Sequence, residues 1–587
     1  MEKITRSVCL ILILLFAWAD LASAQPKPQP MGQKQETPIL VGRLSHVEGE
    51  VVRYVPDEQD WVAIVQDAPF GLNDTLHSNE KGKAEIIMPN NTWVRAAGNT
   101  QVQLIHLEAD LTELDVASGA ARFYNKSSTT VIKATTPFGY VMAPPYSVFD
   151  LYVGDQSVEV ISLKEKVSFV HTKGPVKYEI VAGAASILAD QEQIAPGDGK
   201  VDGEWDGWNL QRDDLWRKRM LAQGDSVKCL PPSLSHDAYV LEENGAWEKI
   251  YYQGAYRRFW RPAHVANGWA PFTVGRWTSW YGENCWIPSE PFGYVTHHYG
   301  SWIFAHGFWY WAPPVVTIAV GPLPLPPPPP LLVIPFAWYP GRVVWIFSGI
   351  YVGWVPLAPF EPYHCHHRWG PHTVVVRHGH HVHSGVRLRD YAHAGRAVIV
   401  PKDRFYRGSD YSSVRLRDVS ETDLTERYQA APVLDDRMFD NYPDPKQRYD
   451  FTDGRIPEKP HQVVIDRIRD NQKSVRLEPG DGKSVQGRVA KTKQGKPREG
   501  IEIVPPKVPN RFVPPEKVRK PRDEMKFPEM EIKRQGGVKP APIQLGSIEE
   551  PAFKPLKRES PAPGQRTPQG SQPRSRSPQT PKRTPQH

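Results

Sequence analysis

The sequence predicts a mainly β protein, in which an antiparallel β domain precedes a Trp-rich β-hairpin repeat domain and a long disordered C-terminal tail. Three observations predict this class. Apolar and polar residues alternate in short segments from residue 41 to about 195, with almost no helical periodicity. Of the 19 tryptophans, 13 fall between Trp247 and Trp369, and 22 of the 59 prolines fall in residues 451–587.

The first 24 residues have the three parts of a secretory signal peptide. A basic start with Lys3 and Arg6 precedes an apolar run over residues 8–19, and Ala22-Ser-Ala24 forms a cleavage site. About a dozen apolar residues are too few to span a bilayer, which needs about 20. We therefore expect cleavage after Ala24, no transmembrane anchor, and export to the periplasm or cell surface of a Gram-negative bacterium.

Residues 25–40 are rich in Gln, Pro and Lys and predict a flexible lead-in. The alternating segments that follow predict an antiparallel β domain over residues 41–200 with a core of its own. The segments are Val47-Glu-Gly-Glu-Val-Val, Ala84-Glu-Ile-Ile-Met, Val102-Gln-Leu-Ile, Leu111-Thr-Glu-Leu-Asp-Val, Val148-Phe-Asp-Leu-Tyr-Val and Val158-Glu-Val-Ile.

This region resembles the FecR domain, an exported β module. The resemblance rests on Val47-Glu-Gly49, Trp61, Thr136-Pro137 and Phe149-Asp-Leu-Tyr-Val153, among others. Signalling members of that family also carry a cytoplasmic segment and a membrane span that contact a sigma factor. The sequence has no counterpart of either, so FecR-type signalling is the disfavoured alternative.

A connecting helix is predicted over residues 203–225. Trp208, Leu215, Trp216 and Met220 are spaced along one helical stripe. We expect the tryptophans of this stripe to pack onto a neighbouring domain.

The tryptophans beyond this helix recur at a regular spacing, which indicates a repeat. Nine residues separate the members of each pair, the second member begins a Trp-x-Pro sequence, and the spacing suits a hairpin with a short loop. Four such units predict one β domain over residues 230–362, with a Pro-rich insertion at 313–340. The pairs are Tyr251 and Trp260, Trp277 and Trp286, Trp302 and Trp311, and Trp345 and Trp354.

The repeat is similar to the DUF6600 family, an uncharacterised domain that often follows a FecR domain. The resemblance covers residues 210–410 and includes Gly349-Ile-Tyr-Val-Gly-Trp354 and Val398-Ile-Val-Pro-Lys-Asp-Arg-Phe405. It implies an architecture and no known activity.

Two interpretations of the repeat tryptophans are open. Aromatic rings on exported β domains can stack on the apolar faces of sugars, which makes Trp277, Trp286, Trp302 and Trp311 candidate ligand-binding residues. The alternative, favoured by the regular spacing, is that they form the core of a thin repeat domain.

The His-rich and mixed segment at 363–425 contains candidate metal ligands. His364, Cys365, His366, His378, His380 and His383 have the imidazole and thiolate chemistry of a zinc, copper or nickel site. Their spacing matches no closed motif, and a polar loop is the favoured alternative. Of the three cysteines after the signal, Cys229 and Cys285 form one of three pairings for a candidate disulfide.

The tail at 430–587 is Pro-rich and basic, and we expect it to be disordered. Its last 137 residues hold 30 Lys and Arg against 16 Asp and Glu, a net charge of +14, which leaves −7 for the rest of the chain. An anionic surface is a candidate partner, a spacer is the alternative, and export argues against nucleic acid.

No Gly-x-Ser-x-Gly, P-loop, dinucleotide fingerprint or His-Glu-x-x-His is present, so no catalytic residue is predicted. We expect a non-enzymatic exported protein that binds or scaffolds cell-envelope polymer or protein through its two β domains. The second hypothesis is a metal-responsive envelope sensor that uses residues 364–383.

Overall fold

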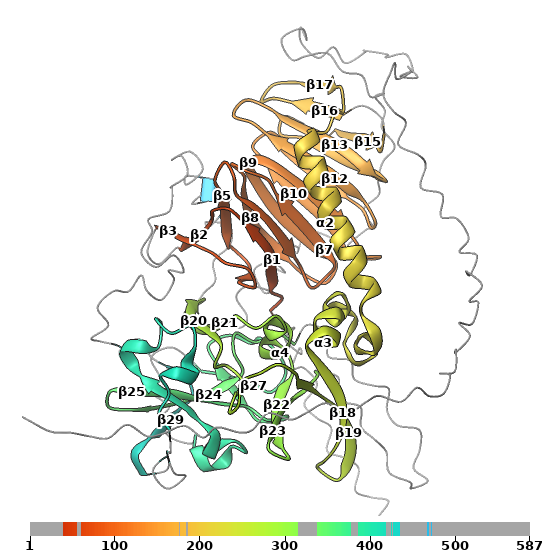
Figure 1. Cartoon of the computed structure of the whole chain (residues 1–587). Helices are drawn as coiled ribbons and strands as arrows, with labels where there is room; N and C mark the ends of the chain where they lie inside the picture. The colour runs from red at the N-terminus through yellow and green to blue at the C-terminus, as the bar shows by residue number, and fades with distance from the viewer. Residues whose placement is uncertain are drawn as a thin grey trace, which may run out of the picture. The chain divides into compact units, whose positions relative to one another are not determined.

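The computed structural model describes residues 39–55, 60–314, 337–376 and 386–417, except 175, 184 and 185, and a few positions between 419 and 471. The predicted signal peptide and lead-in, and most of the tail, lie outside these residues. None of the helices in the described ranges has the length and apolar character needed to cross a membrane. The structure is mainly β, as predicted (Figure 1).

The N-terminal β domain consists of two largely antiparallel ladders that share the long strand β9. One ladder runs β4-β1-β6-β7-β9-β12-β13-β16-β17, and the other runs β3-β2-β5-β8-β9-β10-β11-β14-β15. The strands are β1 (Gly42–Glu48), β2 (Val51–Val55), β3 (Asp60–Ala63), β4 (Pro69–Phe70), β5 (Thr75–Ser78), β6 (Lys83–Ile87), β7 (Thr92–Ala96), β8 (Gln101–Leu107), β9 (Leu111–Asn125), β10 (Val131–Thr136), β11 (Gly139–Ala143), β12 (Val148–Val153), β13 (Val158–Lys164), β14 (Lys166–His171), β15 (Lys177–Val181), β16 (Ser186–Ala189) and β17 (Ile194–Gly197).

Strand β9 can serve both ladders because it is 15 residues long. Its first half pairs with β8 and in parallel with β10, and its second half pairs with β7 and β12. Leu114 and Phe123 of β9 and Phe149 of β12 are fully buried, and buried residues alternate with half-buried ones along β10. The period-two pattern in the sequence therefore corresponds to a real core.

Helix α2 (Gly203–Leu221) confirms the predicted connecting helix (Figure 1). Asp202 begins it, because its carboxylate accepts a hydrogen bond from the backbone N–H of Trp205 at 2.8 Å. The buried face holds Trp205, Trp208, Asn209, Arg212 and Trp216.

Met220, which shares the predicted stripe with Trp208 and Trp216, is 47% exposed, while the polar residues Asn209 and Arg212 are buried. Polar groups on the sheet, and not an apolar stripe, set which face of the helix is covered. A short α3 (Ala238–Asn244) and two 3-10 segments, Gly224–Cys229 and Pro232–Asp237, lead from α2 into the repeat.

Each repeat unit is a two-stranded hairpin that places two tryptophans opposite each other. Three predicted pairs are in register: Trp277 with Trp286, Trp302 with Trp311, and Trp345 with Trp354. Nine residues separate the partners because each turn has two residues and each tryptophan pair is the fourth pair from the turn. The hairpins are β18 (Gly245–Tyr252) with β19 (Ala255–Pro262), β20 (Gly275–Trp280) with β21 (Glu283–Pro288), β22 (Ser301–Ala305) with β23 (Phe308–Ala312), and β24 (Val343–Ser348) with β25 (Tyr351–Pro356).

The predicted pairing in the first hairpin is wrong. Trp260 lies opposite Trp247, and Tyr251 lies opposite Tyr256. The turn falls at residues 253 and 254, which both have positive φ, as the favoured two-residue hairpin turns require. Longer strands then separate the two tryptophans by 13 residues.

The hairpins join through their rings more than through their edges. The first and third share a sheet by the single pair Trp260 and Trp311, whereas β20 and β21 form a sheet of their own. The Trp277 ring centroid lies 5.0 Å from that of Trp286, 4.7 Å from that of Trp345 and 5.5 Å from that of Trp354. The predicted stacking of units is therefore a shared aromatic core, with α4 (Gly293–His298) packed beside β21.

The repeat domain extends beyond the predicted boundary at residue 362. Strand β28 (Val398–Pro401) pairs with β25, and β29 (Gln429–Ala431) pairs with β24. Trp338, at the end of the predicted insertion, is buried and stacks on His298 with 4.9 Å between centroids. Segments predicted as insertion, as mixed sequence and, at residues 430 and 431, as the start of the disordered tail thus complete the core, because the edges of the fourth hairpin need partners.

Small parallel strands, β26 (Tyr363–Cys365) and β27 (Thr373–Val375), form a separate pair in the region after the hairpins.

Three hairpins begin with a Gly-x-Trp sequence. A Cβ atom at Gly245, Gly275 or Gly300 would overlap the ring of the second tryptophan of its own hairpin and a backbone oxygen. Glycine is required at these positions because the ring packs directly on the backbone.

Gly245→Ala is expected to destabilise the protein by about 1–3 kcal/mol through overpacking against Trp260. The backbone at Gly245 is extended, so the change tests steric fit and not conformational strain. Gly207→Ala is the control, because a Cβ atom there meets nothing within 4 Å and helix propensity favours alanine. Urea unfolding measures both; equal stability of the two variants would contradict the packing argument.

Glu290 predicts a pH dependence of stability. Burial raises the pKa of this carboxyl to about 8, while Trp269 donates a 3.0 Å hydrogen bond to it. The unfolded chain releases this proton near pH 4.5, so folding stability from this group falls as pH rises through about 8. Between pH 6.5 and 8 we expect a loss of about 1–2 kcal/mol in the free energy of unfolding.

Glu290→Gln should flatten that slope in a series of urea titrations, since the amide does not ionise. Burial also lowers the pKa of His297 to about 3 and that of His298 to about 4, so their contributions are lost only below about pH 6.5. An unchanged slope above pH 6.5 in the Gln variant would show that Glu290 is not the titrating group.

Candidate functional site

The four tryptophans predicted to bind ligand are buried. Trp277, Trp286, Trp302 and Trp311 are each at most 1% exposed. Their faces contact other rings of the core, and the indole of Trp311 donates to the carbonyl of Tyr299 at 2.7 Å. They form the core, the favoured alternative from the sequence, and present no platform to a sugar.

The predicted metal ligands are only partly described. Within the described ranges no three His, Cys, Asp or Glu side chains gather as a metal site would require. Glu283 instead accepts hydrogen bonds from the backbone N–H of His366 (2.7 Å) and His367 (3.0 Å), and His366 contacts the carbonyl of Val376. His364 is partly buried in β26, and His378, His380 and His383 lie outside the described residues.

The candidate disulfide between Cys229 and Cys285 is not formed, and Cys365 is also a free thiol. Cys285 lies inside the second hairpin, where burial raises its pKa well above the usual range. Cys365 is buried as well and donates its S–H to the carbonyl of His367. Cys285 and Cys365 are therefore buried as free thiols and not joined in a disulfide.

A cavity of about 510 Å³ lies beside the first hairpin and was not predicted from the sequence. Its walls come from β18 and β19, from the 3-10 region after α2, from the ends of β22 and β23, and from residues 337–342 and 359–372. The lining residues are Lys228, Cys229, Leu230, Pro231, Pro232, Trp247, Tyr252, Tyr256, Arg257, Arg258, Phe259, Gly300, Ser301, Ala312, Pro313, Pro314, Ala337, Tyr339, Arg342, Pro359, Phe360, Pro371 and His372. We call it the basic aromatic cavity.

Aromatic side chains supply much of its surface. Tyr256 is 70% exposed and Phe360 is 49% exposed, in contrast to the buried tryptophans. Neighbouring rings contact these groups, since Tyr256 packs on Tyr251 at 5.3 Å and Phe360 packs on His372 at 5.7 Å between centroids. These rings offer apolar faces to a bound molecule.

The charged groups of the cavity are all basic. Lys228, Arg257, Arg258 and Arg342 line it, and no aspartate or glutamate does so among the described residues. Lys228 pairs with the exposed Asp225 at 2.6 Å, outside the lining. The cavity therefore has a positive potential that its own wall does not neutralise.

Arg342 is the most deeply buried of these cations, at 5% exposed. Its guanidinium donates to the carbonyl of Glu361 at 2.8 Å and to the hydroxyl of Ser301, and its Nε has no hydrogen-bond partner. It stacks over the ring of Tyr339 at 5.3 Å. Burial lowers the pKa of Arg342, and among the described residues no carboxylate lies within ion-pair distance.

The four hairpins match a known protein family. Residues 238–361 match DUF6600, a family of unknown function. The match includes all four hairpins and most of the cavity lining. A search of curated proteins found no match.

Two crystal structures of a "putative anti-sigma factor" from Parabacteroides distasonis ATCC 8503 are also similar in part. Each is 15% identical, with a TM-score of 0.19, and the similarity covers 21% of this chain and 59% of the other. The chain thus spans less than two thirds of that structure. At this score the similarity carries no argument about fold or function.

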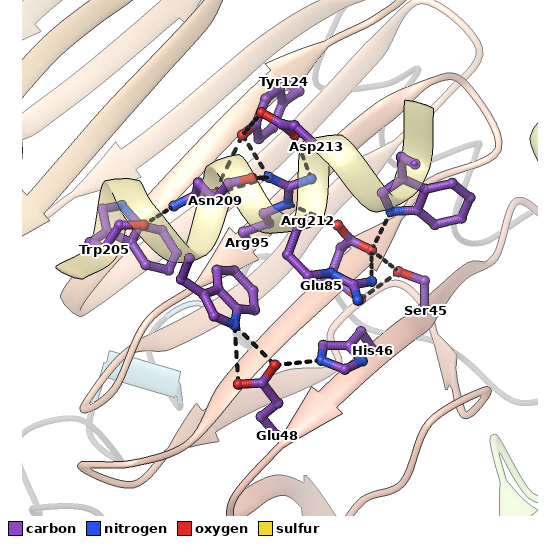
Figure 2. Close-up of polar contacts among 12 residues, drawn as sticks. Ser45, His46, Glu48, Glu85, Arg95, Tyr124, Trp205, Asn209, Arg212 and Asp213 are labelled. Atoms are coloured by element: carbon purple, nitrogen blue, oxygen red, sulfur yellow. Dashed lines mark hydrogen bonds and ion pairs between the residues drawn. The ribbon is translucent and has the colours of Figure 1, made fainter. Parts of the chain in front are cut away.

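The N-terminal β domain is fastened to α2 by a buried polar network (Figure 2). Glu85 on β6 is fully buried. Its carboxylate forms ion pairs with Arg95 and with Arg212 of α2, each at 2.8 Å, and accepts a hydrogen bond from the indole N–H of Trp216 at 2.7 Å. Burial alone would raise its pKa, but the two guanidinium groups hold the pKa of Glu85 at about 2. We call Glu85, Arg95, Arg212 and Trp216 the helix clamp.

Further polar contacts flank the helix clamp. Arg95 also donates to Tyr124 at 2.7 Å and pairs with Asp213 of α2 at 2.7 Å. The indole N–H of Trp208 donates to Glu48 at 3.0 Å, which confirms that this tryptophan packs onto the neighbouring domain (Figure 2). Only the tryptophans of this set could be found from the sequence, because a lone Glu or Arg in a strand gives no pairing signal.

Contacts also join the β domain to the start of the DUF6600 domain. Arg43 on β1 pairs with Asp237, just before α3, at 3.0 Å, and both side chains are buried. Trp280 of the second hairpin donates to Asp74 at 3.0 Å. Residues 228–232, which line one side of the cavity, are therefore held between α2 and α3.

Glu85→Gln is expected to lower the free energy of unfolding by about 3–5 kcal/mol, because Arg212 then stays buried without a carboxylate partner among the described residues and Arg95 keeps only the partly exposed Asp213. Asp214→Asn is the control, since its ion pair with Arg217 on the same helix is exposed and should change stability by at most about 0.5 kcal/mol. Urea unfolding followed by tryptophan fluorescence measures both variants. A small effect at Glu85 would mean that the helix clamp does not hold α2.

Proposed function

We propose that the chain is a non-enzymatic exported protein of the bacterial envelope that binds a cell-envelope polymer in the basic aromatic cavity. The cavity carries the proposal, because it combines exposed rings with charged lining residues that are all basic. Its volume falls within the range of about 300–1,000 Å³ that is typical of ligand sites. The buried tryptophans are excluded as the contact surface.

Export is supported by the signal-peptide features of residues 1–24. In the periplasm or on the surface of a Gram-negative cell, the abundant polymers are glycans and peptidoglycan. Exposed tyrosine and phenylalanine rings suit the apolar faces of sugar rings. The proposal that the chain is not an enzyme rests on its lack of a catalytic motif.

The N-terminal β domain, with its FecR-like sequence pattern, would act as the scaffold. The helix clamp holds α2 on this domain, and the residues directly after α2 form part of the cavity wall. A rigid support of this kind keeps the lining side chains in position for binding.

Tyr256→Ala is expected to weaken retention of the full chain on its polymer about five- to tenfold, equivalent to about 1 kcal/mol of lost ring stacking. Co-sedimentation with peptidoglycan sacculi and with insoluble envelope polysaccharide measures retention. Tyr146→Ala is the matched control, because Tyr146 is also about half exposed but lies in the N-terminal β domain. Failure of the unmodified chain to bind either material would refute the proposal.

A further inference from the structure

We infer that the basic aromatic cavity selects an acidic saccharide, one that carries a carboxylate or a phosphate, and that Arg257 is the residue that contacts the anionic group. The inference rests on the proposed function and adds the chemical class of the ligand. It follows from which cations in and near the cavity are already paired and which are not.

The arginines of strand β19 differ in whether they have an acidic partner. The strand carries three arginines, Arg257, Arg258 and Arg261, of which the first two line the cavity. Arg261, outside the lining, pairs with Glu248 on the adjacent strand at 2.6 Å. Acidic partners are thus available on this hairpin, but none faces the cavity.

Arg257 has no such partner. Its Nε is buried without a hydrogen-bond acceptor, and no carboxylate within the described part of the chain forms an ion pair with it. Arg258 differs, because it lies near the carboxylate of Asp225 and the thiol of Cys229. A guanidinium offers a planar fork of donors that matches carboxylate and phosphate oxygens.

Arg342 adds a second positive charge behind the wall of the cavity. The carbonyl oxygens around its guanidinium fix its position but do not neutralise it, and the nearby carboxylate of Glu361 acts on it from beyond ion-pair distance and outside the cavity lining. A buried cation without a counter-ion is unfavourable in a low-dielectric interior, and an anion bound nearby removes part of that cost. The same charge repels cationic ligands and gives a neutral sugar no comparable gain.

The rings account for the saccharide part of the ligand. Tyr252 and Phe360 line the same cavity as Arg257, and Tyr252 lies on the same face of the first hairpin as Arg257, so one molecule can meet both a ring and a guanidinium. A free inorganic anion would use only the arginines. A sugar that carries an acid group uses both kinds of surface.

Isothermal titration of the full chain tests the selection with two matched pairs of probes. Trigalacturonate is compared with galactotriose for a carboxylate, and trehalose 6-phosphate with trehalose for a phosphate. We expect the charged member of at least one pair to bind at least tenfold more tightly, with affinity that falls as salt rises. The pair that shows the difference identifies which anion is preferred.

Arg257→Gln should reduce binding of the charged probe at least tenfold, Arg257→Lys should retain part of it, and Arg261→Gln should leave it unchanged. Equal affinity for charged and neutral probes would overturn the acidic-saccharide inference while leaving polymer binding intact. Inorganic phosphate that binds as tightly as trehalose 6-phosphate, or retention on envelope polymer with no binding of any probe, would also overturn it. Loss of polymer retention itself would instead refute the proposed function.

Discussion

The repeat domain depends on one interaction, the cross-strand pair of tryptophans in each hairpin. Two strands with a two-residue turn bury too little surface to be stable alone. Each hairpin therefore places its paired rings against those of its neighbours, as Trp277 does with Trp345 and Trp354. The Gly-x-Trp starts and the added strands β28 and β29 are consequences, since the rings need close backbone contact and the hairpin edges need partners.

This use of the tryptophans separates stability from binding. Rings that hold the hairpins together have their faces covered and cannot also stack on a ligand. The strongly exposed aromatic residues of the cavity lining are instead Tyr256 and Phe360, at positions outside the Trp-pair pattern. The cavity forms where the first hairpin meets segments from the 3-10 region after α2 and from residues 359–372, and so combines side chains that are distant in the sequence.

Charge is used in two different ways in this chain. In the helix clamp, Glu85 together with the nearby Asp213 balances the charges of Arg95 and Arg212, so that Glu85 and both arginines can be buried between α2 and the sheet. In the cavity, Arg257 and Arg342 have no such carboxylate within the described residues. Paired buried charges hold the structure together, whereas unpaired ones are available to a ligand.

The sequence by itself determined the fold class, the position of α2 and the register of three of the four hairpins, because strand alternation and Trp spacing are local and periodic. It also indicated that Trp208 and Trp216 would pack on a neighbour. The register of the first hairpin was missed, since a turn at residues 253 and 254 lengthens its strands and the spacing no longer repeats. Only the tertiary structure decided that Trp338, Phe405 and Tyr411 complete the core, that the cysteines stay free, and that Arg257 lacks an acidic neighbour while Arg261 has one. Those outcomes depend on contacts between side chains that are far apart in the sequence, and periodic sequence patterns do not predict such contacts.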